Sequence, residues 1–289
     1  MYNKYFTVEV KPPIDADLQN AAALADDDVI FSWTPFEVPK GSSRLLNVTA
    51  RVTGTDGAAQ HQPFQLLFAR CAANPSSGAL TNPTSMGEYN TVATAIKSKN
   101  EIVGGIKIEA IDYMCQSLVG YSIASTGNSV AANGANVDMV LTPSAEHSHG
   151  HSKYTLDATD ILGAAGDAVP ITPGYDVLWV AGIACGALDF RTTVTTDSPD
   201  AADYAAGVTT IHTDTKDANL VFSVGDVLQE VDNTIVGTIT AIGTADSADV
   251  DITLDREIAN GEVVPRATLA DGVKLYVRNP ITLELSFEK

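Results

Sequence analysis

The chain has 289 residues, of which 45% are hydrophobic and 18% charged, and its 36 acidic and 17 basic side chains give a formal net charge of −19. This composition excludes a disordered chain and predicts a substantial core, in one large β-domain or two unequal domains. The negative charge repels phosphate over most of the surface, so we expect no nucleic-acid partner.

Strand patterns dominate the first two hundred residues. Residues 1–10 alternate apolar and polar side chains and have no apolar signal core. Residues 46–52 and 64–68 alternate in the same way and are separated by a Gly54–Gly57 turn signal. Helical periodicity is weak, and no apolar run reaches the length that spans a bilayer, so we expect no membrane partner. Further strands are expected at 102–111, 119–124 and 137–141.

Residues 175–190 form a long apolar segment, and a glycine inside a strand often marks a bulge or bend. We therefore predict one long strand that bends near Gly182 or Gly186. Many short strands punctuated by Pro, Gly, Asn and Asp favour an all-β fold, specifically a jelly-roll-like β-sandwich.

The segment 192–207 is rich in Thr, Asp, Ala and Ser and has the composition of a linker. About five short strands in about sixty residues follow it, which suits a small acidic SH3-like or OB-like β-barrel. The last segment, 281–288, alternates as a half-buried strand and lies too far downstream for the barrel. The prediction is a large sandwich, an inserted barrel and a final strand that returns to the sandwich, over 1–204, 205–274 and 275–289. A plain C-terminal domain that uses 281–287 itself is the alternative.

Three scattered cysteines, Cys71, Cys115 and Cys185, show no paired spacing. This pattern predicts reduced thiols and folding in a cytoplasm.

A histidine cluster, His147, His149 and His151, is the one local motif with metal-ligand character. Alternate imidazoles on an extended backbone project to one side and could bind a metal ion, with further ligands supplied across a three-fold axis. The alternative is a solvated loop that titrates near neutral pH. We predict no other cofactor.

Sequence motifs for catalysis are weak. The segment Gly120–Ala124 lacks the second glycine of a nucleophile elbow, and Ser122 lies in a strand pattern. No phosphate-binding glycine loop, metal-binding helix motif or Cys-x-x-Cys pair is present. We therefore predict that the protein is not an enzyme. Trp33, near a strand start, is a candidate platform for stacking with a sugar ring.

Four segments, 222–228, 235–243, 252–255 and 279–288, resemble modules in virion proteins of tailed bacteriophages, especially marine phages. The resemblance covers about a quarter of the chain and consists of strand and turn patterns. It implies a capsid decoration or cement protein, a homotrimer that binds the major capsid protein on the outside of the virion and assembles in the host cytoplasm. It supplies no site residues.

The N-terminal segment is the expected docking element, through Tyr2, Lys4, Tyr5 and Phe6, which combine aromatic side chains with positive charge. An ordinary first strand of the sandwich is the alternative. The second functional hypothesis is a tail or fibre adhesion module that binds host-surface carbohydrate through the small barrel or Trp33. An enzyme such as a depolymerase is the third, and it requires carboxylates clustered in a cleft.

Overall fold

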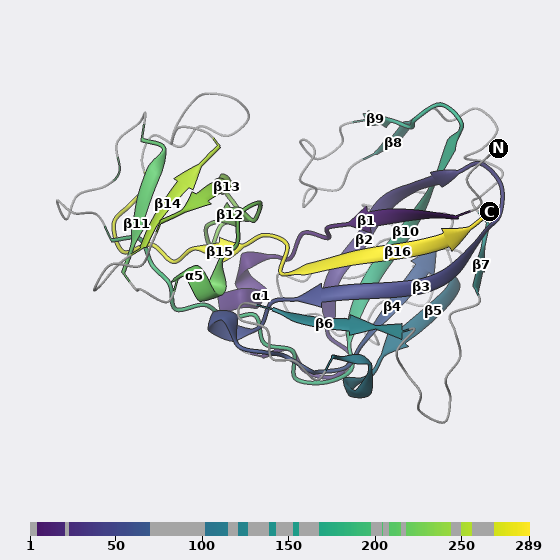
Figure 1. Ribbon diagram of the computed structural model, residues 1–289, viewed down its shortest axis with the longest axis horizontal. Coiled ribbons are helices and arrows are strands. Elements are labelled where there is room, and N and C mark those ends of the chain that lie inside the picture. Colours follow the sequence, from purple (N-terminus) through teal and green to yellow (C-terminus); the bar gives the residue numbers. More distant parts are fainter. Residues whose placement is uncertain are drawn as a thin grey trace.

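The computed structural model describes residues 5–20, 23–69, 102–114, 121–126, 139–142, 153–155, 168–197, 204, 208–214, 218–243, 250–255 and 269–289. The described strands pair antiparallel in three larger sheets and one two-stranded ribbon, and the helices are short, so the prediction of an all-β fold is confirmed. Figure 1 shows a large lobe and a small lobe side by side.

The large lobe is a sandwich of two sheets. Their inward side chains form one hydrophobic core, as expected for facing sheets. One sheet has the order β1-β16-β3-β6, with β7 also paired to β3: β1 (Tyr5–Val10), β16 (Ile281–Glu288), β3 (Ser43–Val52), β6 (Ser122–Ser125) and β7 (Met139–Leu141). The other has the order β2-β10-β4-β5: β2 (Val29–Pro39), β10 (Tyr175–Ala184), β4 (Phe64–Ala69) and β5 (Ile102–Ile108).

Strand β16 lies between β1 and β3, so the end of the chain is part of the sandwich (Figure 1). Its alternate residues are fully buried in the core: Ile281, Leu283, Leu285 and Phe287. In β3 the alternation holds from Val48 to Val52, but Leu45 rather than Leu46 is the next core residue. The cause is a bulge, because Ser286 pairs with Asn47 whereas Phe287 pairs with Leu45.

Strand β10 is buried on both faces, which explains its unbroken apolar sequence. Leu178 and Val180 point into the sandwich core, whereas Trp179 and Ala181 belong to a second cluster on the opposite face of the same sheet. The predicted irregularity is found at Gly182, where the pairing of β10 with β2 shifts register on both sides.

The small lobe contains the sheet order β11-β14-β13-β12-β15 and its own core. Its elements are β11 (Thr210–Thr213), α5 (Ala218–Val221), β12 (Val227–Gln229), β13 (Ile235–Ile242), β14 (Val250–Leu254) and β15 (Tyr276–Val277). Residues 194–197 join its two edges, because Leu275 N donates to Val194 O at 3.1 Å and Asp197 N donates to His212 O at 3.0 Å. Its core therefore includes residues before and after the predicted range 205–274.

The remaining described elements are short: α1 (Ala16–Asn20), η1 (Thr55–Gly57), η4 (Ala110–Asp112) and the ribbon of β8 (Lys153–Thr155) and β9 (Ala168–Pro170). None of the helices in the described ranges is long and apolar enough to cross a membrane.

Candidate functional site

A buried polar network fixes the two lobes against each other. Gln229 in β12 is fully buried, and its amide donates to Ile14 O at 2.8 Å while its oxygen accepts from Arg278 Nη1 at 3.0 Å. Gln19 in α1 donates to Val277 O at 2.9 Å. Because buried polar groups are costly without partners, this network holds the segment after β1 in one position on the small lobe.

A second contact lies at η1, where the large lobe meets α5 of the small lobe. Gly57 has φ +75°, and a Cβ there would lie 2.2 Å from the carbonyl oxygen of Leu220. The neighbouring Asp56 accepts a hydrogen bond from Thr193 N at 2.7 Å. Two separate contacts therefore define how the lobes are oriented.

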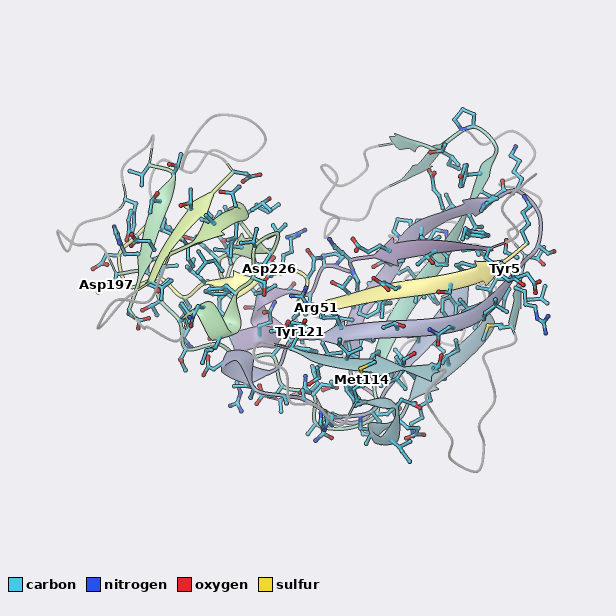
Figure 2. The ribbon with its side chains drawn as sticks, viewed as in Figure 1. Tyr5, Arg51, Met114, Tyr121, Asp197 and Asp226 are labelled. Carbon is cyan, nitrogen blue, oxygen red and sulfur yellow. The ribbon has the colours of Figure 1, made fainter. Side chains whose placement is uncertain are left out.

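Between the lobes lies a cleft of about 500 Å³. We call it the interlobe cleft. Its floor is the outer face of the sheet that contains β1, β16, β3 and β6, and one wall is the turn Val224–Val227 of the small lobe. Figure 2 shows Arg51, Tyr121 and Asp226 at this place. Most of the lining residues are polar or charged: Glu9, Lys11, Thr49, Arg51, Tyr121, Asp226, Asn279, Thr282 and Glu284.

The floor follows directly from strand register. Glu284 lies opposite Glu9 on one side and Thr49 on the other, and Thr282 lies opposite Arg51. Residues paired across antiparallel strands point to the same face. Since the intervening residues of β16 are in the core, these five side chains all point outward, into the cleft.

Two ion pairs partly balance the charge of the interlobe cleft. Lys11 Nζ lies 2.8 Å from Glu9 Oε1, and Arg51 Nη2 lies 3.9 Å from Asp226 Oδ1. The guanidinium of Arg51 also lies 4.4 Å from the ring centroid of Tyr121, in a cation–π contact. The carboxylate of Glu284 is exposed. With every group ionised the cleft has three acidic and two basic side chains, so its charge is close to neutral.

Asp226 is held in a tight turn of the small lobe. Its Oδ2 accepts a hydrogen bond from Ser223 N at 2.8 Å, and the preceding Gly225 has φ +96°, a conformation that favours glycine. Burial raises the pKa of the Asp226 carboxyl, while the Ser223 amide and Arg51 oppose this rise.

We expect Asp226→Asn to be at least as stable as the wild type at pH 7. A carboxyl whose pKa is raised by folding stabilises the fold below its unfolded pKa and loses that contribution as pH rises through the folded pKa. The asparagine can still accept a hydrogen bond from Ser223 N. Because only the wild type has to bury an ionised carboxylate, the stability of the variant relative to the wild type should be highest at pH 7 and should show no gain near pH 3. Urea denaturation at both pH values measures this.

Asp232→Asn is the control, because exposed Asp232 also accepts a backbone hydrogen bond, from Thr234 N at 3.0 Å. The stability of Asp232→Asn relative to the wild type should not increase between pH 3 and pH 7. If Asp226→Asn is less stable than the wild type at pH 7, the cost of burying this carboxylate has been misjudged.

A second surface feature, besides the interlobe cleft, lies at the end of the sandwich remote from the small lobe, where β1 begins and β16 ends (Figures 1 and 2). The register places four outward residues in one row across the sheet: Tyr5, Glu288, Arg44 and Val140. We call this the terminal row. Tyr5 is 59% exposed and Val140 60%, and between them Arg44 Nη1 lies 3.4 Å from Glu288 Oε2. The row therefore presents an ion pair with the Tyr5 ring on one side of it and the Val140 side chain on the other.

The predicted docking residues divide between two roles. Tyr5 is in the terminal row, whereas Phe6 points to the core side of β1 and stacks on Phe287 with ring centroids 5.1 Å apart. Phe6 thus anchors the strand. Tyr2 and Lys4 lie outside the described residues.

Trp33 is only 3% exposed and packs with Trp179 in the cluster on the outer face of the second sheet. In this position its ring offers little surface for stacking with a sugar. His147, His149 and His151 lie outside the described residues, and within the described ranges no group of three histidine, cysteine or acidic side chains could hold a metal ion.

Sequence reasoning did not single out the residues of the interlobe cleft. The alternation of β16 and β3 does indicate that Glu284 and Arg51 point outward. This alternation does not indicate that the turn before β12 covers the outer face of the sheet. The turn and the sheet come together only because of how the two lobes are oriented. The lining of the cleft includes three carboxylates, the kind of group that the enzymatic hypothesis requires, but two of them are ion-paired, Glu9 with Lys11 and Asp226 with Arg51.

The function has to be inferred from the molecule itself, because no protein-family model matches the chain and no curated protein matches it either.

Proposed function

We propose that the protein is a non-enzymatic capsid decoration or cement protein of a tailed bacteriophage, which binds the major capsid lattice as a homotrimer. The observation that carries this proposal is the terminal row, an exposed surface at the opposite end of the molecule from the small lobe (Figure 1). Docking through this end directs the small lobe away from the shell.

The chemistry of the terminal row supports a role in protein contact. Aromatic side chains and arginine are enriched at protein interfaces and provide many of their hot spots, and the row presents both Tyr5 and Arg44, on either side of Glu288. The strands that carry the row are held by the sandwich core, so little conformational entropy is lost on docking. The net charge of −19 makes one trimer repel another in solution before they meet the shell.

The fold supports a component that reinforces a shell. We propose that the sandwich is jelly-roll-like and that the small lobe is an SH3-like or OB-like barrel, in which residues 194–197 connect the two sheet edges. The interlobe network around Gln229 makes the two lobes one block. Such a block suits a protein that stabilises a lattice by contact rather than by motion.

We propose that assembly takes place in the host cytoplasm and that the mature protein lies on the capsid exterior. The described cysteine, Cys185, is an unpaired thiol. Burial raises its pKa, which lowers the thiolate fraction and hence its reactivity. An unreactive thiol is compatible with a reducing compartment.

Replacing Tyr5 with alanine is expected to reduce binding to purified capsids by about tenfold or more while leaving the melting temperature almost unchanged, because truncating an exposed interface anchor removes about 1–2 kcal/mol of binding. Copies per capsid measured by electron cryomicroscopy or by co-sedimentation test this. Deleting residues 1–11 would be a poor substitute, since it removes all of β1, including Val10, which is 3% exposed.

Thr7→Ala is the matched control, because Thr7 is also exposed and outward on β1 but lies outside the terminal row. Unchanged occupancy for Tyr5→Ala, or equal loss for both variants, would contradict docking through this row. Sedimentation equilibrium tests the trimer separately, and a monomer at micromolar concentration would contradict that part of the proposal.

The alternative of a tail or fibre adhesion module predicts a different copy number. Shell proteins occur in many copies per particle and receptor-binding proteins in few, so quantitative mass spectrometry of the virion discriminates between them.

A further inference from the structure

We infer that the interlobe cleft is a binding site for a neutral carbohydrate of one or two sugar units. This goes beyond the proposed docking role, which uses the opposite end of the molecule, and it does not depend on that role. The inference rests on the size of the cleft, the chemistry of its lining and the rigidity of its two walls.

The size of the cleft fits a small ligand. Its volume of about 500 Å³ lies within the range of roughly 300–1,000 Å³ typical of small-molecule sites. The floor is an outer sheet face and the wall is the turn Val224–Val227, so a ligand would contact both lobes at once.

The lining combines hydrogen-bond donors and acceptors. Arg51 can donate, and the carboxylates of Glu284 and Asp226 can accept. The side-chain oxygen of Asn279 can also accept, because its amide nitrogen already donates to the carbonyls of Lys11 and Pro12, and the hydroxyl of Thr282 can do both. Adjacent sugar hydroxyls also donate and accept at once, so such a mixed surface can satisfy them. Apolar side chains complete the lining and can pack on the C–H faces of a sugar ring: Ile123, Val224 and Val227.

Charged ligands match the cleft less well. An anion approaching Arg51 also approaches Glu284 and Asp226, in a protein of net charge −19. A cation approaching Glu284 meets Arg51, which lies opposite Thr282, the next outward residue of β16, and Lys11 beside Glu9. A neutral polyhydroxylated ligand meets neither repulsion and can use both kinds of side chain.

The guanidinium of Arg51 is preorganised for such a ligand. It is held between the ring of Tyr121 and the carboxylate of Asp226, and 40% of its side chain is exposed. Its contact with Asp226 is 3.9 Å, longer than a hydrogen bond, which leaves its N–H groups able to donate to a ligand. The buried network at Gln229 keeps the wall at a fixed distance from the floor.

The test is a glycan array of neutral and charged oligosaccharides, followed by saturation-transfer NMR and calorimetry with maltose, cellobiose and lactose. We expect at least one neutral glycan to bind with a Kd in the range of about 0.1–10 mM. Thr282→Val and Glu284→Gln should each weaken this binding by about tenfold, since each leaves a ligand hydroxyl without a full partner.

The matched control is Thr7→Val, an outward threonine on the same sheet face outside the cleft, which should bind as the wild type does. Binding that survives both cleft variants, or no neutral glycan bound at about 10 mM, would overturn the inference. Binding of spermidine or acetyl-lysine amide alone, lost in Glu284→Gln, would also overturn it, because the cleft would then be a cation site. Capsid occupancy of the Tyr5 variant is independent of each of these outcomes.

Discussion

Replacing Gly182 with alanine is expected to lower the free energy of unfolding by about 3 kcal/mol, the upper range for overpacking a closed core. A Cβ at this position would lie 2.3 Å from the ring of Phe31 and within 2.8 Å of two further ring atoms. Phe31 is fully buried in the sandwich core. Because core side chains surround a fully buried ring at close packing, we expect either β10 or β2 to move.

A double-mutant cycle with Phe31→Leu isolates this contact. The leucine side chain is smaller at the position of the clash, so the added methyl group should cost about 1–2 kcal/mol less in the Phe31→Leu background. Urea denaturation followed by tryptophan fluorescence is the measurement, because Trp33 and Trp179 both lie in the sandwich. A Gly182→Ala protein as stable as the wild type would show that the bulge between β10 and β2 adapts freely.

Gly104→Ala is the matched control. Its added Cβ would also lie 2.3 Å from a neighbour, but that neighbour is the sulfur of Met139, at the flexible end of a partly buried side chain. Since a methionine side chain can move aside, we expect a loss below about 1 kcal/mol. Equal losses at the two glycines would mean that the rigidity of the neighbour does not decide the cost.

The strands of the sandwich could be predicted to the extent that one face of each is buried. The alternation of β16 correctly predicted which of its residues point inward, because the hydrophobic core requires a period of two. In β3 the same reasoning failed at Leu46, since the bulge opposite Phe287 shifts the phase by one residue. A bulge depends on the partner strand, and neither strand alone encodes it.

The interlobe cleft could not be predicted, because its parts meet only in the folded chain. Arg51 and Asp226 are far apart in sequence and lie in different lobes. The contact between Arg51 and Asp226 depends on the interlobe network around Gln229. In the sequence, Gln229 is an ordinary polar residue after Val227 and Leu228. The terminal row is similar, since it combines the N-terminal and C-terminal strands.

Replacing Gln229 with leucine is expected to destabilise the protein by about 3 kcal/mol and to uncouple the two lobes. The leucine has a similar volume but removes one acceptor of Arg278, which is 6% exposed and keeps its charge. The Ile14 carbonyl loses one of two hydrogen bonds, because Gln19 also donates to it, at 3.3 Å. Most of the cost therefore comes from a buried guanidinium that has lost a hydrogen bond.

Two spectroscopic probes can show the uncoupling, since both tryptophans are in the sandwich while far-UV circular dichroism reports on both lobes. The wild type should give one coincident transition, and Gln229→Leu should give a circular dichroism change that precedes the fluorescence change. Gln62→Leu, at an exposed glutamine, is the control and should leave the transitions coincident. Adding Arg278→Met should recover part of the lost stability, because the donor that lost its hydrogen bond to Gln229 is then absent as well. If Gln229→Leu unfolds at the wild-type urea concentration with coincident probes, the lobes are held together by something other than this network, and the fixed geometry assigned to the cleft loses its physical basis.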